Sequence, residues 1–313
     1  MEKSLNGKII KINIVLVTGF LGSGKTTFLN YVIANFKNHG ISLILNEFGD
    51  VKIESNFITE DGVGEIAELS NGCMCCVAKS DIPRVVNYII EKSPSTEYIF
   101  IEASGLSDPD PIKDILIGGI GGNVKYLLNI CVIDSKNFFD LKDKHPLILS
   151  QAGEADVILL SKVSLVEQSI SVKVKTFLQS VFVGTSIFDS DNSVDIGKLL
   201  KIETDNVKTK GEQELKEHHH EHDKYIETIV KLDRKTAKTV VEDIFNQNNQ
   251  IVRAKGYFEE GDNVYSLQFS GQDLDIKRVK SIKNKEGNGV LLFITRVEDK
   301  DNLVKTLQTL KLQ

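Results

Sequence analysis

The sequence predicts an α/β protein with two domains, a larger one built on a mostly parallel sheet and a smaller C-terminal α/β domain. Over the first two hundred residues, short apolar runs rich in β-branched residues alternate with stretches of helical periodicity, which is typical of a parallel sheet covered by helices. The length of 313 residues also exceeds what one small domain needs. A polar, histidine-rich stretch at 204–223 has almost nothing to bury and is interpreted as a solvated linker. We therefore divide the chain into 1–203, the linker 204–223, and 224–313.

The elements of the first domain follow from these runs. Strands are expected at 14–17, 42–45, 98–101, 130–133 and 157–160. After the first strand, apolar residues recur at helical spacing, so one face of this helix should pack on the sheet; they are Phe28, Leu29, Val32, Ile33 and Phe36.

The second domain is expected to contain two helices and at least two strands. Helical spacing is found at Ala237, Val240, Val241, Ile244 and Phe245, and again at Leu303, Leu307 and Leu310. The alternation of Tyr265, Leu267 and Phe269 and the apolar run 289–294 predict strands. The sequence contains no internal repeat.

Composition excludes several classes of protein. Hydrophobic residues make up 41% and charged residues 26% of the chain, so it is not a disordered or fibrous protein. A net charge of -6 gives no basic surface for nucleic acid or an anionic membrane. The N-terminus lacks a secretory pattern, and no apolar run approaches the roughly 20 residues that span a bilayer. We expect a cytoplasmic protein that binds neither nucleic acid nor membrane.

Residues 19–26 read Gly-Phe-Leu-Gly-Ser-Gly-Lys-Thr between the first strand and its helix. This is a full match to the P-loop motif in the required context, and it predicts a P-loop NTPase domain. The backbone of Gly22, Ser23 and Gly24 would hold phosphate, Lys25 would meet the β- and γ-phosphates, and Thr26 would ligate magnesium, with Thr27 beside it. The alternative is a chance glycine-rich turn.

An acidic residue ends the strand at 98–101. Glu102 is therefore the candidate for the magnesium site, and together with Lys25 it forms the candidate catalytic pair. Gly105, three residues later, could bring its N–H to the γ-phosphate in a loop whose order depends on the nucleotide. The alternative for Glu102 is an ordinary exposed acid at a strand end.

Three of the four cysteines, Cys73, Cys75 and Cys76, lie within four positions. Such close thiolates repel one another unless a cation neutralises them, and zinc would accept three sulfurs with Glu47 as a fourth ligand. Buried structural cysteines and a redox pair are the alternatives. A second metal station, weak and rapidly exchanging, could form on the linker; its residues are His218, His219, His220 and His222. A merely solvated polar run explains those histidines equally well.

The ordered set of 19–26, Asn46-Glu47-Phe48-Gly49, 72–76 and 102–109 resembles the CobW family of GTP-dependent metallochaperones, P-loop GTPases related to the urease and hydrogenase nickel accessory proteins. Residues 253–256 resemble a strand of that family's C-terminal domain, and the histidine-rich linker resembles its metal-binding linkers. The resemblance implies GTP or GDP with Mg²⁺, and Zn²⁺ or Co²⁺ at Glu47 and the three cysteines. It also implies delivery of metal to a client metalloprotein or a cofactor-synthesis enzyme, while a homo-oligomer is left open.

The sequence departs from this family at one important position. Where the family has Asn-Lys-x-Asp, this chain reads Ser161-Lys162-Val163-Ser164. Ser164 is a weaker and shorter acceptor for guanine than aspartate, so selection of GTP over ATP should be relaxed. The stem of Lys162 would still pack along the base. The chain also lacks the family's frequent C-terminal tryptophan, because it has no Trp.

The resulting hypothesis is a nucleotide hydrolase, slow without a partner, that couples its nucleotide state to metal at the Cys-x-Cys-Cys motif. A non-catalytic metal buffer or sensor that uses nucleotide as a structural ligand is the main alternative. An ATP-driven enzyme on a small molecule with a structural zinc is disfavoured, since no nucleophile, base and orienting group cluster elsewhere.

Overall fold

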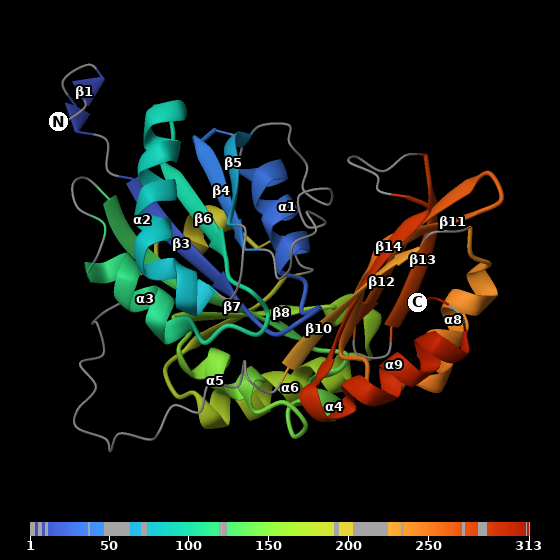
Figure 1. Cartoon of the computed structure of the whole chain (residues 1–313). Coiled ribbons are helices and arrows are strands. Elements are labelled where there is room, and N and C mark those ends of the chain that lie inside the picture. The colour runs from blue at the N-terminus through green and yellow to red at the C-terminus, as the bar shows by residue number, and fades with distance from the viewer. Residues whose placement is uncertain are drawn as a thin grey trace. The chain divides into compact units, whose positions relative to one another are not determined.

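The computed structural model describes residues 4–5, 8–9, 12–36, 38–46, 63–69, 74–118, 120, 124–190, 194–202, 225–232, 235–270, 273–280, 287–310 and 312. The chain divides into two compact units, Met1–His219 and His220–Gln313 (Figure 1). The expected linker 204–223 lies entirely outside the described residues.

A seven-stranded sheet forms the centre of the first unit, in the order β5-β4-β6-β3-β7-β8-β9, with every neighbouring pair parallel. Its strands are β3 (Ile12–Thr18), β4 (Ile41–Asn46), β5 (Val63–Leu69), β6 (Tyr98–Glu102), β7 (Val124–Asp134), β8 (Val157–Ser161) and β9 (Ser186–Asp189). The five strands expected from the sequence lie one each within β3, β4, β6, β7 and β8, so the parallel sheet is confirmed. A separate antiparallel pair, β1 (Ser4–Leu5) and β2 (Lys8–Ile9), precedes it.

Helices cover both faces of this sheet (Figure 1). They are α1 (Lys25–Asn35), α2 (Met74–Lys92), α3 (Pro109–Gly118), α4 (Phe138–Leu141), α5 (Leu147–Gly153), α6 (Gln168–Val181) and α7 (Ile196–Leu199). The apolar residues of α1 and α7 share one core cluster, and those of α2 and α3 share another. β3, β4 and β6 each place buried apolar residues in both clusters, as expected of central strands of a parallel sheet that is covered on both faces.

The second unit has a five-stranded antiparallel sheet in the order β10-β14-β11-β12-β13. Its elements are β10 (Tyr225–Leu232), α8 (Lys238–Gln247), β11 (Arg253–Glu260), β12 (Asn263–Ser270), β13 (Asp273–Val279), β14 (Gly289–Arg296) and α9 (Lys300–Thr309). Val241 and Ile244 of α8 and Leu303 and Leu307 of α9 are buried in one core with the sheet. The two expected helices and the strands at 265–269 and 289–294 are confirmed.

The strand order of the first unit determines where a site can form. β6, β3, β7 and β8 are consecutive neighbours in the parallel sheet, so their carboxyl ends meet at one edge. Ligands of open parallel sheets bind outside this edge. The residues that follow these four strands are therefore the ones brought together.

Candidate functional site

The loop between β3 and α1 depends on its glycines. Gly19, Gly22 and Gly24 have φ values of 129°, 71° and 100°, a region that L side chains rarely adopt. A Cβ on Gly19 would also lie 2.2 Å from the Val132 carbonyl oxygen. The chain thus reaches α1 through a tight loop that ends at the first turn of the helix, where backbone N–H groups favour an anion.

Lys25 is the first residue of α1 and is only 4% exposed. Its ammonium donates to the carbonyl oxygens of Gly19 (2.8 Å) and Phe20 (3.2 Å). The cation is therefore held inside the loop that precedes its own helix. Ser23 is buried in the same loop, and Thr27, the third residue of α1, is exposed.

The Thr26 hydroxyl lies against the carboxylate at the end of β6. It donates to Glu102, with Oγ1 at 3.1 Å from Oε1 and 3.3 Å from Oε2. Glu102 is paired in register with Val17 of β3 and is 6% exposed, so it is not an ordinary exposed acid. The structure brings these two predicted residues together across 76 positions of sequence.

Gly105 follows β6 and lies directly on the glycine-rich loop. A Cβ there would come within 2.7 Å of the Leu21 nitrogen and 2.8 Å of its Cα. Only a residue without a side chain allows this approach, because two of the three nearest atoms belong to the Leu21 backbone, which cannot move aside as a flexible side chain can. The predicted switch-loop glycine and the predicted phosphate loop are thus in contact.

Lys162 follows β8 and has an unusual backbone. Its φ of 57° is the only positive φ at a non-glycine residue among the described ranges. Its ammonium forms an ion pair with Asp134 at 2.8 Å, in which Asp134 is 10% exposed. The Ser161 hydroxyl donates to the Ser23 carbonyl oxygen, which connects this segment to the glycine-rich loop. Ser164, at the position of the expected guanine acceptor, lies exposed in the short 3-10 turn η2 (Val163–Leu165).

Asp134 was not identified from the sequence. It ends β7 and accepts hydrogen bonds from the backbone N–H groups of Lys136 (2.9 Å) and Asn137 (3.2 Å) and from the Asn137 amide (2.9 Å). An acid directly after the apolar run 130–133 is the same pattern that selected Glu102. That pattern could have found this residue.

Cys131 of β7 is a buried thiol beneath the loop. Burial raises its pKa to about 12, although a hydrogen bond with Thr18 and the charge of Lys25 act in the opposite direction. The thiol is therefore neutral in the folded protein near pH 7. It is a core residue.

Most of the predicted metal ligands fall outside the described residues: Glu47, Cys73, His218, His219, His220 and His222. The backbone of Cys75 and Cys76 lies in the first turn of α2, which begins at Met74. Farther along α2, Ile82, Val86 and Ile89 recur at helical spacing and are buried in the core. Within the described ranges, no group of three or more His, Cys, Asp or Glu side chains could hold a metal.

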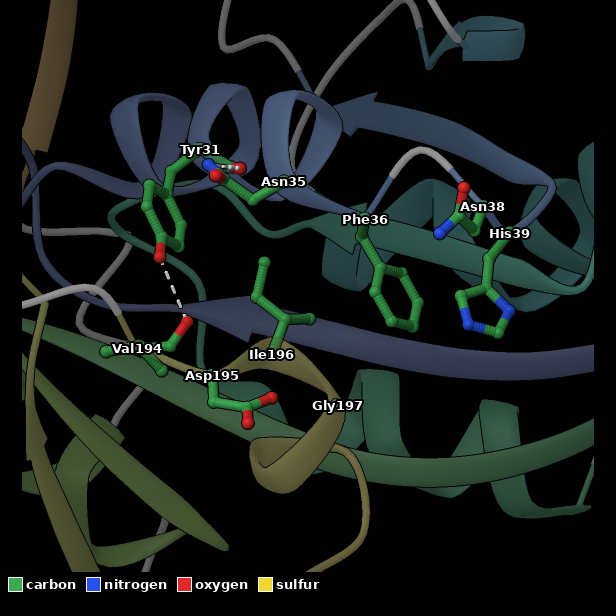
Figure 2. Close-up of a pocket in the computed structure, with 9 residues that line it drawn as sticks. All are labelled: Tyr31, Asn35, Phe36, Asn38, His39, Val194, Asp195, Ile196 and Gly197. Atoms are coloured by element: carbon green, nitrogen blue, oxygen red, sulfur yellow. Dashed lines mark hydrogen bonds between the residues drawn. The ribbon is translucent and has the colours of Figure 1, made fainter.

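A depression of about 350 Å³ lies at the carboxyl end of α1, lined by residues from α1, the following loop and the segment 194–197. Figure 2 draws these residues as sticks. Tyr31, Asn35, His39 and Asp195 line it, and each forms a hydrogen bond within the protein. The depression lies at the opposite end of α1 from the glycine-rich loop. Because its polar groups are used within the fold, we assign it no ligand.

No described helix has the length and apolar character needed to cross a membrane.

Two family models match the chain. The model for the CobW/HypB/UreG nucleotide-binding domain matches residues 13–187. The model for the cobalamin synthesis protein cobW C-terminal domain matches residues 226–311. Together they account for most of both compact units.

The proteins similar to the chain include two named relatives and one solved structure. "Zinc-regulated GTPase metalloprotein activator 1" of Dictyostelium discoideum is 30% identical over 224 residues, covering 59% of this chain and 46% of that protein, so this chain spans about half of its length. "Zinc chaperone CobW" of a Sinorhizobium species is 27% identical over 263 residues, covering 71% of this chain and 73% of that protein. The crystal structure of Zn(II)-bound YjiA GTPase from Escherichia coli covers 96% of this chain and 99% of its own, with 18% identity and a TM-score of 0.48. Such a distant structural match does not justify comparison of individual residues.

Proposed function

Because this chain belongs to the CobW/HypB/UreG family, we propose that it is a nucleotide-dependent metallochaperone. In this proposal the first unit is a P-loop NTP hydrolase that binds zinc or cobalt as cargo and passes it to a client metalloprotein or cofactor-synthesis enzyme. Two relatives named for zinc, one of them a chaperone, support the choice of cargo.

The observation that carries the proposal is the contact between Thr26 and Glu102 at 3.1 Å. A hydroxyl at the second residue of the P-loop helix and a carboxylate at the end of the neighbouring strand are the oxygen donors that magnesium requires. Magnesium, when bound, would neutralise charge on the transferred phosphoryl group. Glu102 is buried and Thr26 is partly buried, so water would have limited access to a cation held between them.

The glycine-rich loop fits a polyphosphate. Its three positive-φ glycines keep side chains out of the concave side of the loop. Lys25 already lies in this loop on the carbonyl oxygens of Gly19 and Phe20, and phosphate oxygens are stronger acceptors than these carbonyls for an ammonium. We infer that Lys25 exchanges these carbonyls for the β- and γ-phosphates when nucleotide binds.

Purine selection should depend on Lys162 and Ser164. The ion pair with Asp134 fixes the Lys162 ammonium, which leaves its aliphatic stem as the surface for a base. A serine hydroxyl cannot accept the two hydrogen bonds from guanine that a carboxylate accepts. We therefore propose that both GTP and ATP bind, with a weaker preference for guanine than an Asn-Lys-x-Asp sequence would give.

The cargo site proposed here consists of Cys73, Cys75 and Cys76 with Glu47. Three thiolates and one carboxylate suit zinc, and cobalt fits the same donors. The sequence positions of these residues, after the strand that follows α1 and before β6, support a link to the nucleotide loop. The linker histidines His218, His219, His220 and His222 would bind metal more weakly.

Two experiments test the proposal. Thr26→Ala should abolish magnesium-dependent nucleotide binding and phosphate release, whereas Thr26→Ser, which keeps the hydroxyl, should retain both. Magnesium-dependent binding by Thr26→Ala at the wild-type level would refute the assigned site. Zinc titration of the reduced protein with no nucleotide, with GDP and with a non-hydrolysable GTP analogue tests the coupling, and equal zinc affinity in all three states would refute it. Phosphate release above background separates a chaperone that hydrolyses nucleotide from a passive metal buffer.

A further inference from the structure

A buried glutamine holds the loop that follows Glu102. Gln151 of α5 is 0% exposed. Its Nε2 donates to the carbonyl oxygens of Gly105 (3.2 Å) and Ser107 (3.0 Å). One side-chain amide therefore uses both of its N–H groups on a single loop that is more than forty positions away in sequence.

The held loop is the one that contacts the P-loop. It forms a tight turn in which the Ser107 N–H donates to the Ser104 carbonyl oxygen at 2.9 Å. Its Gly105 lies against the backbone of Leu21, with no room for a Cβ. Gln151 and Leu21 thus fix the loop from two sides, and any shift of Gly105 must change at least one of these contacts.

Two polar atoms at this contact have no hydrogen-bond partner in the described structure. They are Gln151 Oε1 and Ser107 Oγ, both buried. One is an acceptor and the other can donate, and they belong to residues that already bond through other atoms. A buried unpaired polar group is unfavourable, so a second arrangement of the loop in which the Ser107 hydroxyl donates to Gln151 Oε1 would gain a bond that this arrangement lacks.

We propose that Gln151 is a positioning residue that sets the Gly105 loop for contact with the γ-phosphate and allows the loop two hydrogen-bonded arrangements. The proposal rests on the proposed nucleotide function of the same site. Gln151 does not touch nucleotide in this scheme. It acts through the Gly105 and Ser107 carbonyl groups, whose peptide units fix the direction of the loop's N–H groups.

The scheme explains why the residue is a glutamine. An apolar side chain of equal size would fill the space and leave the two loop carbonyls without donors. A glutamate would place a carboxylate against two carbonyl oxygens, which repel it. Only an uncharged amide supplies two donors to the loop together with a spare acceptor for a shifted Ser107.

The test compares Gln151→Met with Gln151→Glu by calorimetric titration with GDP and with the β,γ-imido analogue of GTP. ADP and the β,γ-imido analogue of ATP are titrated in the same way. Gln151→Met removes both hydrogen bonds to the loop. Triphosphate binding should therefore weaken about tenfold relative to diphosphate binding, which is the loss expected for one charge-assisted hydrogen bond. Gln151→Glu should match Gln151→Met at pH 8 and recover part of the preference at pH 6, because a buried carboxyl has a raised pKa and its protonated form can donate.

The control is Asn248→Leu, which removes a buried amide that donates to the Ile244 carbonyl oxygen at 2.8 Å in the second unit. It should lower the melting temperature without changing the ratio of triphosphate to diphosphate affinity. A Gln151→Met protein with the wild-type ratio would overturn the positioning role and leave the proposed function intact. Wild-type protein that binds neither nucleotide would overturn both.

Discussion

The backbone of Lys162 provides a test in which stability and nucleotide affinity change independently. Two substitutions, Lys162→Gly and Lys162→Ala, both remove the ammonium that pairs with Asp134 and the stem proposed to support a base. They differ in the residue left at a φ of 57° and a ψ of 26°. Alanine keeps a Cβ in the left-handed region, and glycine does not.

The expected difference follows from two opposing terms. The left-handed conformation costs an L residue roughly 1–2 kcal/mol. Glycine avoids this cost but loses about 0.4–1 kcal/mol through the greater freedom of the unfolded chain. Both variants lose the ion pair, and Asp134 keeps three N–H donors from Lys136 and Asn137 in each. The cost of losing the ion pair is therefore the same in both variants and does not contribute to the difference between them. The free energy of unfolding of Lys162→Gly should exceed that of Lys162→Ala by about 1 kcal/mol.

Thermal unfolding without nucleotide measures this difference. For a unit of this size, about 1 kcal/mol corresponds to a melting temperature roughly 2–4 °C higher for the glycine variant. Nucleotide must be absent because a ligand bound to the folded state raises the melting temperature. Both variants should lose nucleotide affinity to the same extent, since both lack the stem. If Lys162→Ala is as stable as Lys162→Gly, the left-handed backbone is wrong. If either variant binds nucleotide like the wild type, the base contact is wrong.

Three further predictions concern neighbouring residues. Gly105→Ala places a Cβ within 2.8 Å of Leu21 backbone atoms and should reduce the free energy of unfolding by about 1–3 kcal/mol and weaken triphosphate binding; unchanged calorimetric titrations would contradict the close contact. Glu102→Gln removes the carboxylate charge but keeps an acceptor for Thr26, so phosphate release and its magnesium dependence should fall while the melting temperature changes little; a wild-type rate would exclude Glu102 from the site. Cys131 has a folded-state pKa of about 12 against an ordinary value of 9.0, so its contribution to stability is complete below pH 9 and declines as the pH rises toward 12. The free energy of unfolding of Cys131→Ala, measured by chemical denaturation, should fall less between pH 9 and 12 than that of the wild type. The same dependence on pH in both proteins would contradict the raised pKa of Cys131.

Local pattern was sufficient to predict the P-loop and most of the parallel sheet. A buried parallel strand is an apolar run by necessity, and 98–101, 130–133 and 157–160 each showed one. The same reasoning missed β5, which contains Glu65 and Glu68, and β9, which has only four residues. Both are edge strands, whose exposure allows polar residues and short length.

The residues that hold the site in place were harder to predict. The link between Lys162 and Asp134 requires knowing that β7 and β8 are neighbours, which no single segment of sequence specifies. Gln151 gave no indication at all, because a lone glutamine in a short helix is most often exposed. Its function appears only when the loop after β6 is folded against α5.

The central place of β3 in the sheet has a consequence for the growing chain. Ile12–Thr18 is made first among the seven strands, yet its two partners begin at Tyr98 and Val124. At translation rates of about 5–20 residues per second, this apolar strand waits on the order of 5–20 s for its neighbours. During that interval the apolar segment of the nascent polypeptide is exposed to the ribosome surface and to chaperones. Added nucleotide should not stabilise a nascent chain whose Lys162 has not yet emerged from the ribosome.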